Sequence, residues 1–254
     1  MRSIALLAAF AFSAAAAELK PKTLEAFDRY IRQAEERLAS ANVFLWADES
    51  PDRLRRVRAG EIVVSPYLKK PETSVPNGLI HDWVGSVFIP GATLDRTLAM
   101  VQEYNHHKDI YKPEVLDSRI LAHHDNFFHI YMRLLKKKVI TVVLDTEHDV
   151  TYTKIDAARW RSVSKTTKIA EVENPGKADE REKPPDTGEG FLWRLNSYWR
   201  FAERDGGVWV ECEAISLTRD IPTGLGWLIE PIIRNLPRES LENTLRATRK
   251  VLVQ

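Results

Sequence analysis

The sequence contains a single cysteine in 254 residues. Cys212 therefore cannot form a disulfide within the chain, and packing alone must hold the fold together. In a strand, Cys212 would share one face with Val210 and Ala214. We therefore interpret it as a buried apolar residue and not as a nucleophile.

An excess of charge of either sign is also missing. The chain has 37 Lys and Arg against 36 Asp and Glu, and Arg2 is the only charged residue in positions 1–17. This balance provides no electrostatic attraction to nucleic acid or to an anionic membrane surface. We therefore expect no nucleic-acid partner.

Several sequence motifs that mark enzymes are absent. The chain has no Gly-rich phosphate loop, no G-x-S-x-G and no H-E-x-x-H. No nucleophile with a partnered base stands out either. We therefore predict no cofactor and assign no catalytic residue.

Long apolar segments are scarce, and the one at the N-terminus is short. Residues 4–12 are apolar, whereas a membrane-spanning helix needs about 20 such residues. Arg2 precedes this run and small residues at 13–17 follow it, as in a secretory signal peptide. We predict a signal peptide at 1–17, Glu18 as the first mature residue, and a periplasmic or secreted protein without an integral membrane segment. The alternatives are a buried N-terminal helix and a retained membrane anchor.

Residues 18–78 are interpreted as an N-terminal helix followed by a proline-rich extension. The apolar residues Leu24, Phe27 and Ile31 recur at helical spacing within a predicted helix over 23–40. Residues 47–79 are expected to be irregular. The basic run at 53–58 is expected to be a solvated face, with a protein-interaction role as the alternative.

From residue 79 the pattern becomes regular. A strand at 80–89 is followed by a helix at about 93–104 and then by strands and a loop. Residues 147–149 and Arg204-Asp205-Gly206-Gly207 are interpreted as turns, the second of them closing a hairpin. The predicted strands are 114–122, 127–135, 139–146, 150–155, 160–172, 191–203 and 208–217, with a loop at 173–190.

The C-terminal end is predicted to be helical. A short helical stretch at 222–236 precedes a new helix that starts at Pro237. Leu241, Leu245 and Leu252 form a stripe along this last helix. A curved antiparallel sheet needs its concave face covered, so we predict an α+β fold in which the last helix covers it.

The end of the chain carries a resemblance to a known family. The segments "GGVWVECEAISLTRDIP" and "WLIEPIIRNLPRESLENTLRATRKVL" resemble the last strand and C-terminal helix of the START-like (SRPBCC) superfamily. The resemblance implies that residues 79–254 form a helix-grip domain that encloses a lipid-like or other hydrophobic molecule between sheet and helix. It implies no reaction, because the superfamily includes both carriers and enzymes.

The last two strands supply most of the candidate ligand-binding residues. Their mixed polar set either faces solvent or forms a polar floor that anchors the ligand's head group. A buried Arg–Glu arrangement would have to be mutually paired. Aromatic residues are more often core than ligand platforms. The candidate set is Tyr198, Arg200, Glu211, Glu213, His129, Trp193 and Trp227.

The histidines do not match a metal-binding motif. His106 and His107 are adjacent, and His123 and His124 lie in a predicted turn, so we predict no metal site. The chain is therefore expected to be a non-catalytic binding or carrier protein. The alternative is a cyclase- or hydrolase-type enzyme that uses Glu211, Glu213, His129 or Tyr198 as acid or base. The oligomeric state stays open.

Overall fold

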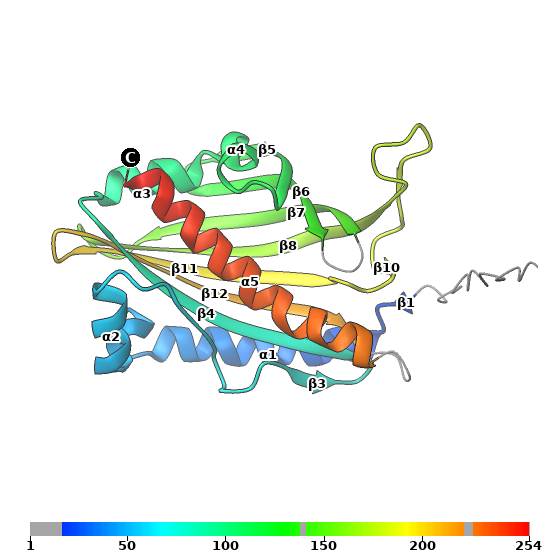
Figure 1. Cartoon of the computed structure of the whole chain (residues 1–254), viewed down its shortest axis with the longest axis horizontal. Coiled ribbons are helices and arrows are strands. Elements are labelled where there is room, and N and C mark those ends of the chain that lie inside the picture. Colours follow the sequence, from blue (N-terminus) through cyan, green and yellow to red (C-terminus); the bar gives the residue numbers. More distant parts are fainter. Residues whose placement is uncertain (1–16, 138–140, 221–225, 254) are drawn as a thin grey trace, which may run out of the picture.

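A computed structural model describes residues 17–137, 141–220 and 226–253, with side chains from 235 onward in the last segment. Figure 1 shows a large antiparallel sheet crossed by a long C-terminal helix, α5 (Gly226–Leu252). The other helices are α1 (Pro21–Ser40), η1 (Trp46–Glu49), α2 (Pro51–Arg58), α3 (Leu94–Gln102), η2 (Tyr104–His106) and α4 (His107–Ile110).

Eight strands follow one another across the main sheet in the order β2-β4-β12-β11-β8-β7-β6-β5, and every neighbouring pair is antiparallel. The short strands are β1 (Ala17–Glu18), β2 (Val63–Pro66), β3 (Thr73–Val75), β9 (Arg181–Glu182) and β10 (Thr187–Gly188). The long strands are β4 (Gly78–Pro90), β5 (Val115–His124), β6 (Phe127–Lys137), β7 (Thr141–Lys154), β8 (Arg159–Glu173), β11 (Arg194–Arg204) and β12 (Gly207–Arg219). The α+β prediction and the hairpin between β11 and β12 are confirmed.

Two predicted strands turn out to be one. The prediction of a turn at 147–149 is wrong, because β7 runs without interruption from Thr141 to Lys154. The charged triplet continues the strand because its side chains alternate between the two faces of the sheet. Glu147 and Asp149 reach His129 on one face, whereas His148 is buried on the other.

The predicted break before Pro237 is also wrong, because α5 continues through this residue. A proline removes one helical hydrogen bond, and the apolar stripe of Leu241, Leu245 and Leu252 keeps the helix packed on the sheet. Residues 221–225, at the start of the predicted helical stretch, lie outside the described residues.

The segment 47–79 is more regular than its prolines indicated. Ser50 caps α2 by accepting a hydrogen bond from the Arg53 amide at 3.4 Å, and Pro51 occupies the first helical turn. The basic run at 53–58 therefore lies in a helix. Its outer side is solvated as predicted, since the Arg55 side chain is 75% exposed.

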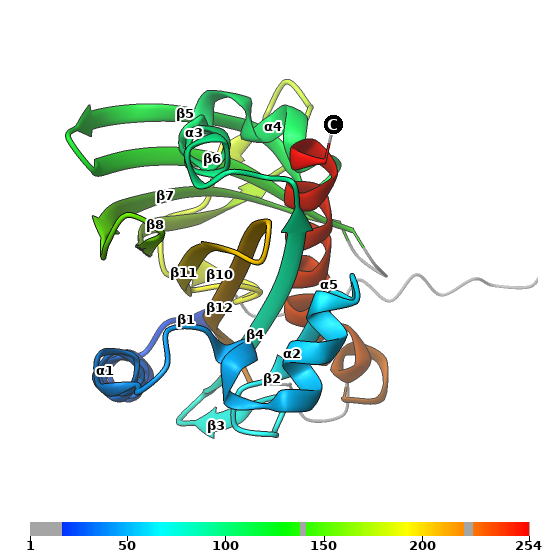
Figure 2. The same cartoon turned by 90° about the vertical axis from the view of Figure 1, so that its left-hand side faces the viewer.

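Helices cover the two faces of the sheet on opposite sides of β4 and β12 (Figure 2). Val210 and Cys212 pack in one cluster with Leu241 of α5. Ile215 of the same strand, at the other parity, packs with Phe27 of α1. Successive strand residues point to opposite faces, so we call these the α5 face and the α1 face. No helix of the described residues is both long and apolar enough to cross a bilayer.

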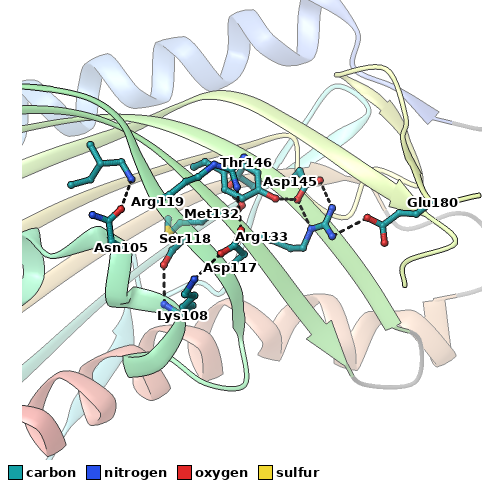
Figure 3. Close-up of polar contacts among 12 residues, drawn as sticks. Asn105, Lys108, Asp117, Ser118, Arg119, Met132, Arg133, Asp145, Thr146 and Glu180 are labelled. Atoms are coloured by element: carbon teal, nitrogen blue, oxygen red, sulfur yellow. Dashed lines mark hydrogen bonds and ion pairs between the residues drawn. The ribbon is translucent and has the colours of Figure 1, made fainter. Parts of the chain in front are cut away.

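A polar network links β5, β6 and β7 near the β5 edge of the sheet (Figure 3). Arg133 donates two hydrogen bonds of 2.8 Å to the carboxylate of Asp145 and a third, of 2.9 Å, to Glu180. Burial opposes ionisation of Asp145, but hydrogen bonds from Arg133 and Tyr131 lower its pKa overall. This network ties the loop that contains Glu180 to the sheet.

Helix α5 approaches the sheet closely at Gly85 of β4. A β-carbon at this position would lie 2.6 Å from Cδ1 of Leu245 and 3.4 Å from Cδ2 of Leu241. A side chain at this position would have to displace the Leu245 side chain.

We expect Gly85→Ala to lower the free energy of unfolding by about 1–3 kcal/mol, because the added methyl group overpacks the contact with α5. Urea unfolding would measure the loss. A double-mutant cycle with Leu245→Ala is the control, and the second change should cost less in the Gly85→Ala background than in the wild type. Additive effects would contradict this account of the contact.

Candidate functional site

The α5 face of the sheet is apolar where α3 and the second half of α5 cover it. Val87, Phe128 and Val150 lie there with Leu241 and Leu245 of α5 in one buried cluster. Inside this cluster, the hydroxyl groups of Tyr104 and Tyr152 form a hydrogen bond of 2.8 Å. This end of the α5 face is a packed core.

Further along the strands the α5 face becomes polar. Cross-strand partners share a face of a sheet, and Ser164 pairs with both Val150 and Ser197. His148 likewise pairs with Thr166, and His81 with Ser216. We define the polar patch as His81, Thr146, His148, Ser164, Ser197 and Ser216.

The histidines of the polar patch are neutral. Burial lowers the pKa of His81 and of His148 to about 4. His81 Nε2 lies 3.1 Å from the hydroxyl of Thr218, and His148 Nε2 lies 3.0 Å from that of Thr146. The polar patch therefore offers uncharged hydrogen-bonding groups, which suit a hydroxyl or carbonyl group better than an ion.

Aromatic and apolar residues surround the polar patch without being fully covered. Trp199, Trp160, Met132 and Ala214 are only partly buried on the α5 face. Their strands are interior to the sheet, but α5 lies against β4, β12 and β2 at one side of it. The α5 face of β11 and β8 thus keeps accessible surface of mixed apolar and polar character.

Three buried nitrogen atoms on this face lack partners. Trp83 Nε1, His81 Nδ1 and His148 Nδ1 make no hydrogen bond within the part of the chain that the structure describes. A buried donor without a partner costs about 1–3 kcal/mol. Such atoms point to a bound water or to a polar group of a ligand.

The candidate residues of the last two strands come together on the other side of the sheet, the α1 face. Glu211 accepts hydrogen bonds from the backbone amides of Trp46, at 2.6 Å, and Ala47, at 2.8 Å. Glu213 is bound by Arg37 of α1, with contacts to both carboxylate oxygens. The polar set is therefore neither solvated nor beneath α5, because residues 18–78 cover it.

Tyr198 and Arg200 lie beside these carboxylates. The hydroxyl of Tyr198 donates to Glu35 of α1 at 3.0 Å. Arg200 stands directly opposite Glu211 in the β11–β12 ladder. The sequence predicted this grouping but not the helix that covers it.

Asp82 extends the group of carboxylates on the α1 face. It accepts a hydrogen bond of 2.8 Å from Tyr30 of α1. Burial, together with the nearby charge of Glu213, raises the pKa of Asp82 to about 8. Burial likewise raises the pKa of Glu211 to about 7, against the opposing effect of the Trp46 and Ala47 amides.

The remaining candidates are dispersed. His129 is on the α1 face, with Nδ1 2.8 Å from Asp149 and Nε2 3.3 Å from Glu147. Trp193 is buried against α1 in the cluster of Phe27. The side chain of Trp227 lies outside the described residues. No group of three or more His, Cys, Asp or Glu side chains within the described ranges is placed to hold a metal ion.

The polar patch was missed at the level of sequence. The alternation of Ser162, Ser164 and Thr166 in a predicted strand was the available signal. It looks like an ordinary solvated face until the ladder places Ser164 opposite Ser197, on the face of the sheet that carries α5.

The described residues form the predicted helix-grip arrangement, an antiparallel sheet with the C-terminal helix on its α5 face. The predicted fold class is confirmed. No family model and no curated protein matches the sequence.

Similar solved structures include a STAR-related lipid transfer protein from Xanthomonas axonopodis, with 17% identity over 73% of this chain and 100% of that chain, at a TM-score of 0.49. The Zhui aromatase/cyclase from Streptomyces sp. R1128 has 13% identity over 68% and 92% of the two chains, at a TM-score of 0.42. Human STARD10 has 11% identity over 84% of each chain, at a TM-score of 0.43. These likenesses concern the arrangement of sheet and helix.

The raised pKa of Asp82 makes stability depend on pH. The folded state binds this proton more tightly than the unfolded chain, in which the pKa is near 3.8. Its stabilisation is therefore fully present below pH 3.8 and is lost as the pH rises through about 8.

We expect Asp82→Asn to remove this part of the pH dependence, which is at most about 1.4 kcal/mol per pH unit. Urea unfolding between pH 5 and pH 8.5 would measure this pH dependence. The free energy of unfolding of the variant should rise relative to that of the wild type as the pH rises. Asp28→Asn, on the exposed side of α1, is the matched control. Parallel curves for wild type and Asp82→Asn would refute the assignment.

Proposed function

We propose that this protein is an exported, non-catalytic carrier of a hydrophobic small molecule held between α5 and the α5 face of the sheet. One observation carries the proposal. The α5 face of β8 and β11 presents partly buried aromatic and small polar side chains next to the unpartnered nitrogen of Trp83. Ligand pockets combine an apolar lining with a few placed polar groups in this way.

The chemistry of the polar patch narrows the class of ligand. Trp83 Nε1 can only donate a hydrogen bond, and the histidines are neutral. We infer a largely apolar molecule with one or two uncharged oxygen atoms, such as hydroxyl or carbonyl groups.

A carrier is favoured over a cyclase- or hydrolase-type enzyme by the placement of the acid and base candidates. Glu211, Glu213 and Tyr198 are engaged by the N-terminal extension on the α1 face. His129 is on that face as well, paired with Asp149. A ligand beneath α5 would meet none of these four side chains.

Binding is tested with the neutral probe Nile red on protein freed of lipid by organic extraction. We expect Ser197→Phe to weaken Nile red binding by about tenfold or more, because the added ring fills the α5 face. Ser74→Phe, at an exposed position of β3, is the matched control and should bind as the wild type does. Equal Nile red binding by wild type and Ser197→Phe would exclude this site.

The same extract distinguishes carrier from enzyme. Mass spectrometry of the molecule released from the purified protein should identify a hydrophobic compound. That compound should be recovered chemically unchanged after incubation with fresh protein. Conversion to a new product would establish catalysis and overturn the carrier assignment.

Export is proposed from the N-terminal sequence, since residues 1–16 lie outside the described residues. From Glu18 onward the chain has its own attachments: Glu18 pairs with Thr187, and the Leu19 amide donates to the Asp186 carbonyl at 2.9 Å. A mature protein that begins at Glu18 would keep both contacts.

We expect the mature protein recovered from the periplasm or medium of an expressing bacterium to begin at Glu18. Intact-mass measurement and N-terminal sequencing would show this. An Arg2→Glu variant tests the positive n-region and should slow processing. Recovery of unprocessed protein from the cytoplasm alone would argue against export.

A further inference from the structure

A pocket of about 470 Å³ opens on the α1 face, between the end of α1 with its following loop and the strands β8 and β11. Its volume lies within the range of small-molecule sites. Tyr198 and Val163, which line it, belong to the cluster formed with α1 and not to the core beneath α5. The pocket therefore opens mainly on the side of the sheet opposite to the proposed carrier site, although Trp199 of β11 also borders it.

Three arginines line one side of this pocket: Arg159, Arg161 and Arg200. Arg161 and Arg200 stand directly opposite each other in the β8–β11 ladder, and Arg159 pairs with Ala202 one step along the same face. Like charges directly opposed across a ladder are destabilising. An anion between the two guanidinium groups would relieve this repulsion.

The acidic residue of the pocket is already engaged. The Glu35 carboxylate accepts a hydrogen bond of 3.0 Å from Tyr198 and an ion pair of 2.6 Å from Lys165. It therefore contributes little to neutralising Arg161 and Arg200.

The two opposed arginines are also left without direct partners. Arg159 binds Asp156 at 2.7 Å. Arg161 and Arg200 make no hydrogen bond or ion pair with the residues that the structure describes, and Arg200 is held only by the longer-range attraction of carboxylates such as Glu211 and Glu213. Glu211, which stands opposite Arg200, uses its oxygens on backbone amides. Both guanidinium groups are thus available to a ligand in the pocket.

The opposite side of the pocket is apolar. Leu38, Val43, Phe44 and Ile155 line it, and Val43 and Ile155 are 38% and 41% exposed. An adjoining pocket of about 320 Å³ shares Val43, Phe44 and Arg159 and continues toward residues 202–204, where charged side chains line it. The apolar surface beside Arg161 and Arg200 is therefore that of the first pocket itself.

We propose that this pocket binds an anionic amphiphile, with its carboxylate or phosphate head on Arg161 and Arg200 and its apolar chain along Leu38, Val43 and Phe44. The planar fork of arginine matches both head groups with paired hydrogen bonds. The pocket is thus a second ligand site, and both the N-terminal extension and the sheet contribute residues to it.

The test uses decanoate, decyl phosphate and decanol as probes on the full mature chain. We expect decanoate and decyl phosphate to shift the side-chain Nε–H resonances of Arg161 and Arg200 in NMR spectra, whichever head group is preferred. Arg161→Gln, at an exposed position, should weaken the binding of the preferred anion by about tenfold or more. Arg55→Gln, a matched charge removal on α2, should leave it unchanged.

Three outcomes would overturn the proposal. Decanol could bind as tightly as the two anions, Arg161→Gln could leave the dissociation constant unchanged, or the anions could leave the arginine resonances unshifted. Nile red binding separates this site from the α5 face. Arg161→Gln should not affect it, so either site can fail alone.

Discussion

The antiparallel ladder between β4 and β12 is buried on both faces, and the rest of the structure is arranged around that constraint. Apart from Pro90, every residue of β4 is buried, and so are all but two of β12. A ladder in the middle of a single-layer sheet needs a cover on each side. Helix α5 provides one cover and the extension of α1 and η1 provides the other. The N-terminal extension is therefore part of the core.

Because the ladder is buried on both faces, each of its polar residues needs a hydrogen-bonding or charged partner. The two faces supply these partners in different ways. On the α1 face, Glu211 and Glu213 receive donors from η1 and from Arg37, and Tyr30 of α1 satisfies one oxygen of Asp82. On the α5 face, neutral serine and histidine side chains replace charges. The α1 face thus holds charge by pairing it, and the α5 face presents uncharged hydrogen-bonding groups around an apolar surface.

This division separates two kinds of ligand chemistry on one sheet. The α5 face suits a neutral, mostly apolar molecule, as in the proposed carrier function. The pocket at the end of α1 carries opposed arginines next to apolar side chains and suits an anion with an apolar chain. The sequence analysis grouped Arg200 and Glu213 into one anchor for the ligand's head group. In the structure, Glu213 binds the helix that covers the α1 face, and Arg200 borders the second pocket.

Local patterns determined most of the elements. Alternation in 191–203 and 208–217, with Asp205-Gly206 at a turn, predicted the final hairpin because strand period and turn chemistry are local properties. Helical spacing predicted α1, and the C-terminal stripe of Leu241, Leu245 and Leu252 predicted which face of α5 packs. The errors arose where a local signal was overridden. The charged residues at 147–149 were predicted to form a turn, but their side chains alternate between the two faces of β7. Pro237 was predicted to start a helix, but it lies within α5.

The sequence by itself determined that Tyr198 and Arg200 share a face, as do Glu211 and Glu213, because the period of a strand fixes parity. Only the tertiary structure decided what covers that face, since the covering helix lies more than 150 residues away in the chain. The same holds for the polar patch, whose members come from β4, β7, β8, β11 and β12 and meet only through the register of the ladder. Parity is local, whereas burial depends on which distant segment docks.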